Sequence, residues 1–318
     1  MSRILVSGSI AYDVLFGFEG SFLDTLKPDA LEALSVAFVS PRRVRQYGGT
    51  GVNVAWGIRA LGKDPLLVGA VGSDGGEYLR LLERKRIATD YIEQIEDQVT
   101  ATAIITTDSQ ERQITFFHPG ADAHAAWPSS ALEQEDISLA IASPRDPLAV
   151  QAGIAWCNAR KIPVFFDPGQ GIGGFGKEEL RRLTAASAGV VANEYEWAVL
   201  KDATGHDENT IAELTPLAII TRGERGLTYI SREGSGEVPA CRAERVVNPT
   251  GAGDALRAGL LTGLLAGWPL QDACQLGCAM GSFAVEIDGT LIRASRDAIF
   301  KRAEMAYGES LPKEHVVR

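Results

Sequence analysis

Short apolar segments rich in valine and isoleucine recur along the chain, and each is followed by a turn signal and a stretch of helical periodicity. This alternation is typical of parallel strands joined by helical crossovers. We therefore predict an α/β fold with a doubly wound, mainly parallel sheet flanked by helices. The six predicted strands are Ile4–Val6, Leu66–Val71, Ile137–Ala142, Val164–Phe166, Gly189–Ala192 and Leu217–Thr221.

Three other segments alternate between apolar and polar residues with period two: Val14–Phe18, Val36–Arg45 and Thr100–Phe117, the last divided by a turn at Asp108–Glu111. Such alternation is typical of antiparallel strands with one exposed face. Because these segments are interleaved with the rest of the chain, we predict one domain, residues 1–318, with a small β-sheet lid formed by residues of about 14–46 and 98–120. An exposed strand of this lid offers an edge for pairing with a second copy in a homodimer.

The composition, with 45% hydrophobic residues in 318, is that of a globular protein. The net charge of −10 argues against a general nucleic-acid binder, because such a protein needs a basic surface. Neither a signal-peptide pattern nor an apolar run long enough for a bilayer is visible, so we expect a cytoplasmic protein without a membrane partner. The cysteines fit neither a disulfide framework nor zinc-site spacing, and we predict buried thiols at Cys157, Cys241, Cys274 and Cys278.

The most informative motif is Gly251-Ala252-Gly253-Asp254, directly before a helical pattern that begins at Ala255. Glycines leave the backbone N–H groups of a turn open, and a helix N-terminus adds unpaired donors and a positive dipole end, so this turn is suited to hold an anion. A carboxylate beside such a site could accept a proton from a hydroxyl that attacks a phosphate. The motif thus indicates phosphoryl transfer, although an acidic residue also stabilises the first turn of a helix without any further role.

This glycine turn is not a P-loop, since no Lys-Ser/Thr pair follows it, and other residues must supply those roles. Asn193 follows a buried strand, with Glu196 three residues later. A capping box accounts for both residues, but Glu196 could also hold magnesium directly or through water. A glycine turn after another strand places Thr221, Arg222 and Gly223 where a nucleotide-binding edge would contact phosphates or ribose, although a hairpin needs such glycines for its own geometry.

Candidate substrate ligands follow the first strand and open a helix further along the chain. Asp13 is predicted at the carboxyl end of the parallel sheet, where ligands of such folds bind, although an Asp can also cap a turn. Gly48 and Gly49 form a turn that opens a helix, and the apolar positions of this helix leave Asn53 on another face. The Asn amide offers both donors and an acceptor to a polyol.

Four motifs, in this order along nearly the whole chain, resemble those of the PfkB family, the ribokinase-like kinases of sugars and nucleosides. They are Gly48-Gly49 with Asn53, Asn193-x-x-Glu196, Thr221-x-Gly223-x-x-Gly226 and Gly251-Ala252-Gly253-Asp254. The resemblance implies a kinase that uses ATP and Mg²⁺. It implies that Asp254 is the catalytic base, that Gly251, Ala252 and Gly253 form the anion hole, that Asn193 and Glu196 support magnesium and phosphate, that Thr221 with Gly223 lies at the ATP edge, and that Asp13, Gly49 and Asn53 hold substrate hydroxyls.

One departure from the family pattern concerns a monovalent cation. Family members often begin the last motif with Asp, which helps to bind such a cation beside the anion hole, whereas this chain has Asn248. A neutral amide would bind the cation less tightly, so the resemblance does not imply potassium activation here.

Two segments, Gln113–Ala121 and Ala284–Thr290, look like those of bacterial and archaeal nucleoside kinases of this family, especially adenosine kinase. Period two sends Phe116 and Phe117 to opposite faces, so one ring can pack the lid while the other, assigned to Phe117, lies against a purine. A packing role for both rings is the alternative. We predict ATP-dependent phosphorylation of the 5′-hydroxyl of a nucleoside, adenosine to AMP as in purine salvage. The alternatives are a ribokinase- or fructokinase-like sugar kinase and a non-catalytic nucleoside- or sugar-binding regulator.

Overall fold

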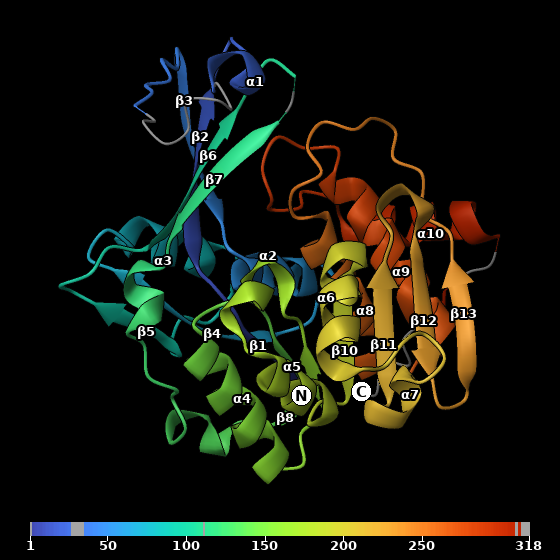
Figure 1. Cartoon of the computed structure of the whole chain (residues 1–318). Coiled ribbons are helices and arrows are strands. Elements are labelled where there is room, and N and C mark those ends of the chain that lie inside the picture. Colours follow the sequence, from blue (N-terminus) through green and yellow to red (C-terminus); the bar gives the residue numbers. More distant parts are fainter. Residues whose placement is uncertain (1, 27–34, 111, 309–310, 313–318) are drawn as a thin grey trace.

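The computed structural model describes residues 2–26, 35–110, 112–308 and 311–312, which form a large and a small sheet with helices (Figure 1). The large sheet has nine strands in the order β13-β12-β11-β10-β9-β8-β1-β4-β5. The strands from β11 to β5 in this order are parallel to one another, whereas β12 pairs antiparallel with both β11 and β13. The strands are β1 Arg3–Ser7, β4 Pro65–Gly72, β5 Ile92–Ile95, β8 Ile137–Ala142, β9 Val164–Phe166, β10 Gly189–Asn193, β11 Leu217–Thr221, β12 Leu227–Ser231 and β13 Gly234–Val238.

All six predicted strands are present in this sheet, and the predicted α/β class is confirmed. Successive residues of a buried strand point to opposite faces, and Ile4 and Val6 accordingly pack into one core while Leu5 packs into another. The first core contains side chains of α2 Thr50–Ala60, α3 Gly76–Arg84, α8 Ala252–Leu265, α9 Leu270–Ala284 and α10 Arg296–Tyr307. The second contains those of α4 Pro147–Ala159, α5 Lys177–Ala185, α6 Glu194–Thr204 and α7 Ile211–Leu214.

The small sheet extends away from the large one and has the order β3-β2-β6-β7 (Figure 1). Its strands are β2 Ala11–Gly17, β3 Arg42–Gly48, β6 Ala101–Thr107 and β7 Gln113–His118. The outer pairs are antiparallel as predicted, but β2 and β6 are parallel, so the expectation of a purely antiparallel sheet is wrong. After β3, which is antiparallel to β2, the chain passes through α2, β4, α3 and β5 and then enters the small sheet again as β6, in the direction of β2.

The strand predicted at Val36–Arg45 begins only at Arg42 and continues to Gly48. Upstream of it, Phe38 packs edge-on against Phe18 and Phe22 rather than alternating across a ladder. Pro41 then lacks the N–H that a ladder requires. The short helix α1, Phe22–Thr25, contributes to this aromatic cluster. Residues 27–34 of the predicted lid and Glu111 of the predicted turn lie outside the described residues.

The register of the small sheet decides which side chains share a face. Asp13 lies opposite Ala103, which lies opposite Phe117, so Asp13 and Phe117 are on the same face and Phe116 is on the other. Phe116 and Phe117 are 67% and 54% exposed. The expectation that one of the two rings packs the lid is wrong, because β7 is an edge strand and leaves both rings exposed.

The remaining expectations from composition concern thiols and membrane spans. All four cysteines are free and buried, as predicted. Across residues 2–26, 35–110, 112–308 and 311–312, no helix combines the length and the hydrophobicity needed to cross a membrane. The described residues also include the short 3₁₀ helices η2 Gly120–Ala123, η4 Gly169–Gly174 and η5 Gly223–Arg225.

Candidate active site

Helix α8 starts at the glycine motif. The sequence predicts this helix from Ala255, but it begins one turn earlier, at Ala252, with Gly251 as its N-cap. Gly251 has a φ of 83°, which favours glycine, whereas Gly253 adopts helical geometry. A glycine inside a first turn is tolerated, so the second glycine does not delay the helix as the sequence suggests. Asp254 is consequently the third residue of α8.

In the first turn of α8, the Ala252 amide donates to the Pro249 carbonyl at 3.3 Å, so this member of the predicted anion hole is already occupied. The neighbouring amides differ from it. For the amides of Gly251, Gly253 and Asp254, no hydrogen-bond acceptor is found among the described residues, whereas the Ala255 amide already donates to the Gly251 carbonyl at 2.9 Å. Unsatisfied donors at a helix N-terminus, together with the positive end of the helix dipole, are suited to hold an anion.

Asp254 is half-buried and held by one neighbour from α2. The Nδ2 of Asn53 donates to Oδ2 of Asp254 at 2.7 Å, and Oδ1 of Asn53 accepts a hydrogen bond from Thr290 Oγ1 at 2.8 Å. Oδ1 of Asp254 makes no hydrogen bond within the described part of the chain. Burial raises the pKa of Asp254 to about 7, although Arg257 and the Asn53 hydrogen bond oppose this rise. A carboxyl group that titrates near neutral pH is suited to act as a general base.

Asp13 lies on β2 of the small sheet, and not directly at the carboxyl end of the large sheet as predicted. Its carboxylate is close enough to influence the pKa of Asp254 electrostatically. Burial raises the pKa of Asp13 itself to about 6. A Cβ at Gly48 would lie 2.3 Å from Oδ2 of Asp13, so only glycine leaves room for this carboxylate. The two acids therefore border one site, Asp13 from the small sheet and Asp254 from helix α8.

Helix α2 also begins with a glycine N-cap of positive φ, Gly49 at 90°. A Cβ at Gly49 would lie 2.5 Å from the Ser9 carbonyl oxygen, which shows how closely the two backbones approach. The first amides of α2 are occupied, since Thr50 N donates to Ser9 Oγ and Gly51 N donates to Ser9 O. This turn positions Asn53, which is 6% exposed, and its first two amides are not open to a ligand.

At the start of α6, Asn193 and Glu196 form a capping box. Both carboxylate oxygens of Glu196 accept hydrogen bonds from Asn193, at 2.8 Å each, and Glu196 is 5% exposed. Burial raises the pKa of Glu196. Its occupied oxygens fit a contact with magnesium through water better than direct coordination. Within the described residues, no group of three or more His, Cys, Asp or Glu side chains is arranged to hold a metal ion.

The predicted ATP edge is formed by adjacent strand ends. Asn193 of β10 lies opposite Thr221 of β11, and the following turn contains η5. Arg222 donates from Nε to Thr228 Oγ1 at 2.9 Å across the hairpin. Gly223 has a φ of 57°, and at Gly226 a Cβ would lie 2.0 Å from a backbone oxygen of β13. Gly226 is thus required for the hairpin itself, whereas Thr221 and Gly223 remain at its surface.

Asn248, the departure from the family pattern, closes a turn ahead of the anion site. Its Oδ1 accepts a hydrogen bond from Thr250 N at 2.9 Å, and its backbone N–H donates to the Val285 carbonyl. The absence of potassium activation stays a prediction.

Sequence reasoning missed three residues of this site. Thr290 orients Asn53, and Asp167, which follows β9, accepts a hydrogen bond from Arg257 of α8 at 2.6 Å. All three are buried, with exposed fractions of 6% or less. A usable signal exists only for Arg257, which is a single charged residue within a helical run of small and apolar residues.

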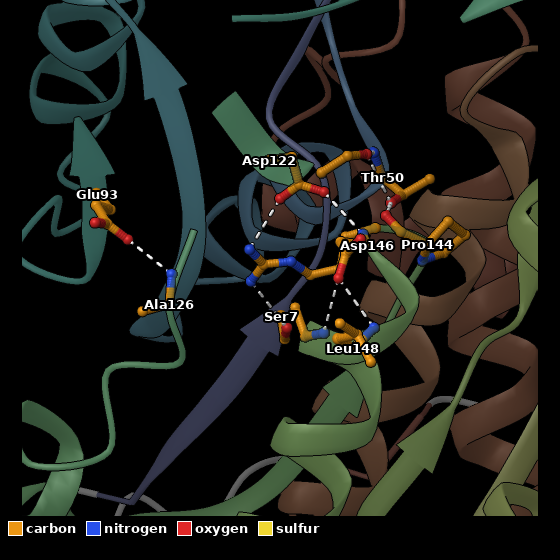
Figure 2. A network of polar contacts seen from close by, with 11 residues as sticks. Ser7, Thr50, Glu93, Asp122, Ala126, Pro144, Asp146 and Leu148 are labelled. Atoms are coloured by element: carbon orange, nitrogen blue, oxygen red, sulfur yellow. Dashed lines mark hydrogen bonds and ion pairs between the residues drawn. The ribbon is translucent and has the colours of Figure 1, made fainter. Parts of the chain in front are cut away.

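A second buried ion pair lies below the small sheet. Arg145, between β8 and α4, contacts Asp122 of η2 at 2.9 Å, and both side chains are nearly inaccessible. Figure 2 shows Asp122 also accepting a hydrogen bond from the backbone of Asp146, with Ser7 of β1 beside the same network. The pair connects the segment that follows β7 to the carboxyl ends of the central strands β1 and β8.

Solved structures resemble this fold over nearly its whole length. The nucleoside kinase of Burkholderia thailandensis in complex with inosine has a TM-score of 0.89 and 34% identity, covering 98% of this chain and 100% of that chain. Its complex with ADP-inosine has a TM-score of 0.86, with 34% identity over 100% and 99% of the two chains. The nucleoside kinase of Methanocaldococcus jannaschii is 30% identical over 292 residues, which cover 91% of this chain and 92% of that protein.

Fold and site together define a ribokinase-like kinase, an ATP-dependent phosphotransferase with an alcohol group as acceptor. The family model described as pfkB family carbohydrate kinase matches residues 20–296, and the chain belongs to this family. The resemblance to the PfkB family and the predicted ribokinase-like architecture are confirmed.

Proposed function

We propose that this protein transfers the γ-phosphoryl group of ATP to the 5′-hydroxyl of a nucleoside, with adenosine as the acceptor and AMP as the product. The observation that carries the proposal is the position of Asp254. Its Oδ1 is without a hydrogen bond among the described residues, and its carboxyl group lies in the same helical turn as the open amides of Gly251 and Gly253. A base and an anion site are therefore side by side.

In the proposed reaction, Asp254 accepts the proton of the attacking hydroxyl as the new O–P bond forms and the bond to the ADP oxygen breaks. The open amides of Gly251 and Gly253 stabilise the charge on the transferring group. Asn53 orients Asp254, and one Nδ2 hydrogen remains to bind a sugar hydroxyl. Asp13 and the Gly48–Gly49 turn hold the other hydroxyls from the side of the small sheet.

A nucleoside is favoured over a free sugar by the face on which Phe117 lies. Phe117 shares the face of Asp13 and is 54% exposed, so its ring is available to a base attached to the sugar. The similarity to nucleoside kinases, including one in complex with inosine, supports a purine nucleoside.

ATP binds, in this proposal, along Asn193, Thr221, Arg222, Gly223 and Gly226, so that its phosphates reach the start of α8. Magnesium neutralises the phosphate charge when bound, and Glu196 would hold one of its waters. The small sheet acts as a lid that excludes water from the reaction. A homodimer formed through an edge of this sheet stays a prediction.

The proposal is tested with purified protein, ATP and Mg²⁺, by measuring ADP release with adenosine, inosine, guanosine, cytidine, ribose and fructose. We expect turnover with purine nucleosides, adenosine having the highest kcat/KM, and a product phosphorylated at the 5′ position by NMR. Higher kcat/KM for ribose or fructose would replace the proposal by a sugar kinase. Calorimetric binding of a nucleoside without ADP release from any acceptor would indicate a non-catalytic regulator.

A further inference from the structure

Arg257 is a buried cation located directly behind the candidate anion site. It lies three residues after Asp254 on α8, and its side chain is 7% exposed. Its Nη2 donates to Oδ1 of Asp167 at 2.6 Å and to the Val191 carbonyl at 3.4 Å. These contacts connect α8 to β10 and to the residue after β9. The guanidinium is thus fixed relative to three elements of the large sheet and its helices.

The same guanidinium reaches the glycine turn. A Cβ at Gly253 would lie 2.9 Å from Nη1 of Arg257, and no other atom outside the local helix backbone and the adjacent residues would lie within 4 Å of it. A side chain at position 253 would therefore displace the arginine before it met anything else. Glycine at this position leaves the amide open and also makes room for Arg257.

The charges around Asp254 are unbalanced without this arginine. Arg257 favours the ionised form of Asp254, whereas Asp167 and Asp13 disfavour it, and Glu196 contributes a further negative charge beside Arg257. Asn53, from α2, is the neutral group that contacts the carboxylate. Arg257 is accordingly the one cation among the described groups that act on Asp254, and it shares its charge with Asp167.

We propose that Arg257 is a positioning residue, which, held by Asp167, keeps the Asp254 carboxylate and the Gly253 turn in the arrangement needed for proton transfer to the base. This inference rests on the proposed function. It assigns the buried pair a task that differs from the stabilisation of the fold, because Arg257 acts on the two groups that face the substrate.

The inference predicts that substitutions of Arg257 and Asp167 shift the pKa of Asp254 in opposite directions. Asp254 must lose its proton before it can act as a base, so kcat/KM rises as pH increases through its pKa of about 7. Removing the cation with Arg257→Met raises this pKa. The acid limb, which is the rising part of the plot of kcat/KM against pH, then moves to higher pH by at least about one unit for a neighbouring charge. Removing the anion with Asp167→Asn moves the limb to lower pH. Arg257→Lys keeps the charge and restores most of the wild-type position.

The chain offers a matched control in the pair of Arg145 and Asp122, which is equally buried but does not act on Asp254 (Figure 2). We expect Arg145→Met to lower the melting temperature, as Arg257→Met does, and to leave the acid limb in place. Equal pH profiles for wild type, Arg257→Met and Asp167→Asn, with only thermal stability changed, would overturn the proposal.

A second readout separates this inference from the function on which it rests. The carboxyl group of Asp254 is titrated by ¹³C NMR, and its signal is assigned as the one that disappears in Asp254→Asn. We expect the same opposite displacements in this titration, with no need for turnover. If the wild type phosphorylates no acceptor but the titrations shift as stated, the proposed function fails and the coupling of Arg257 to Asp254 stands. Titrations that do not shift reject the inference, whatever the activity.

Discussion

Helices α2 and α8 begin in the same way and use their first turns differently. Each has a glycine N-cap with positive φ, Gly49 at 90° and Gly251 at 83°, and neither has a side-chain cap. In α2, the first amides donate to Ser9, whereas in α8 the amides of Gly251 and Gly253 have no acceptor among the described residues. The two helices then meet through the hydrogen bond between Asn53 and Asp254.

The difference shows that a glycine turn before a helix is not by itself an anion site. The unpaired N–H donors of a helix N-terminus can find acceptors within the protein, as in α2, and the turn then serves to position a side chain. In α8 the Ala252 amide is likewise occupied, by the Pro249 carbonyl, but the Gly251 and Gly253 amides have no acceptor among the described residues, and the adjacent carboxylate is held by the other helix. One turn is thus structural and the other is available for chemistry, and substitutions at four positions test this distinction.

The largest effect is expected for Asp254→Asn. The amide cannot accept the hydroxyl proton, and general bases contribute about 10²–10⁴-fold to rates. We expect kcat to fall at least about a hundredfold, while the dissociation constant of ATP, measured by calorimetry, changes much less. An unchanged kcat would show that another group takes the proton and that the open amides of α8 do not define the reaction centre.

The next effect distinguishes the two glycines. A Cβ at Gly251 would meet Thr290 at 3.0 Å, whereas a Cβ at Gly49 would meet backbone atoms at 2.5–2.6 Å. Positive φ alone costs a non-glycine residue about 1–2 kcal/mol. We expect Gly251→Ala to lower kcat about tenfold with a moderate loss in the free energy of unfolding. We expect Gly49→Ala to lower the free energy of unfolding more than Gly251→Ala does.

Chemical denaturation and steady-state kinetics on both glycine variants check this prediction. The distinction between the helices breaks if Gly251→Ala keeps its kcat, or if Gly49→Ala folds as stably as the wild type and loses only turnover.

The smallest effect is expected for Thr290→Val, which leaves Asn53 Oδ1 without its 2.8 Å donor. A buried acceptor without a partner costs about 1–3 kcal/mol, and a less well oriented Asn53 raises the nucleoside KM several-fold. Thr262→Val is the control, since Thr262 is a buried threonine of α8 that donates to the Ala258 carbonyl within its own helix. Similar KM values for both variants would mean that Thr290 does not act through Asn53.

The large sheet was predictable because its strands combine apolar runs with helical crossovers, and each buried face follows from alternation, as Ile4 and Leu5 illustrate. The parallel pairing of β2 with β6 was not predictable, since alternation of apolar and polar residues shows only that the two faces of a strand differ and not in which direction its neighbour runs. Similarly, the exposure of Phe116 depends on the position of β7 at a sheet edge, which no local pattern contains.

At the site, the motifs identified residues that act through their backbone, such as Gly251, because the local backbone conformation restricts the residue type. The contact of Asn53 with Asp254 joins positions 201 residues apart, and no spacing in the sequence indicates it. Arg257 stands out as a charge within an apolar helical run, but its partner Asp167 lies 90 positions away on a different element, so the sequence does not indicate their contact.

The parallel pair in the small sheet has a consequence for how the chain folds. Ala11 pairs with Ala101, 90 positions along the chain, whereas Ala11 also pairs with the much nearer Gly48. Contacts between distant positions form slowly because a long loop must first close. We expect β2 and β3 to pair early. The other edge of β2 then stays unpaired until β4, α3 and β5 have docked and β6 can add to it. During synthesis, this unpaired edge of β2 is open to pairing with other chains.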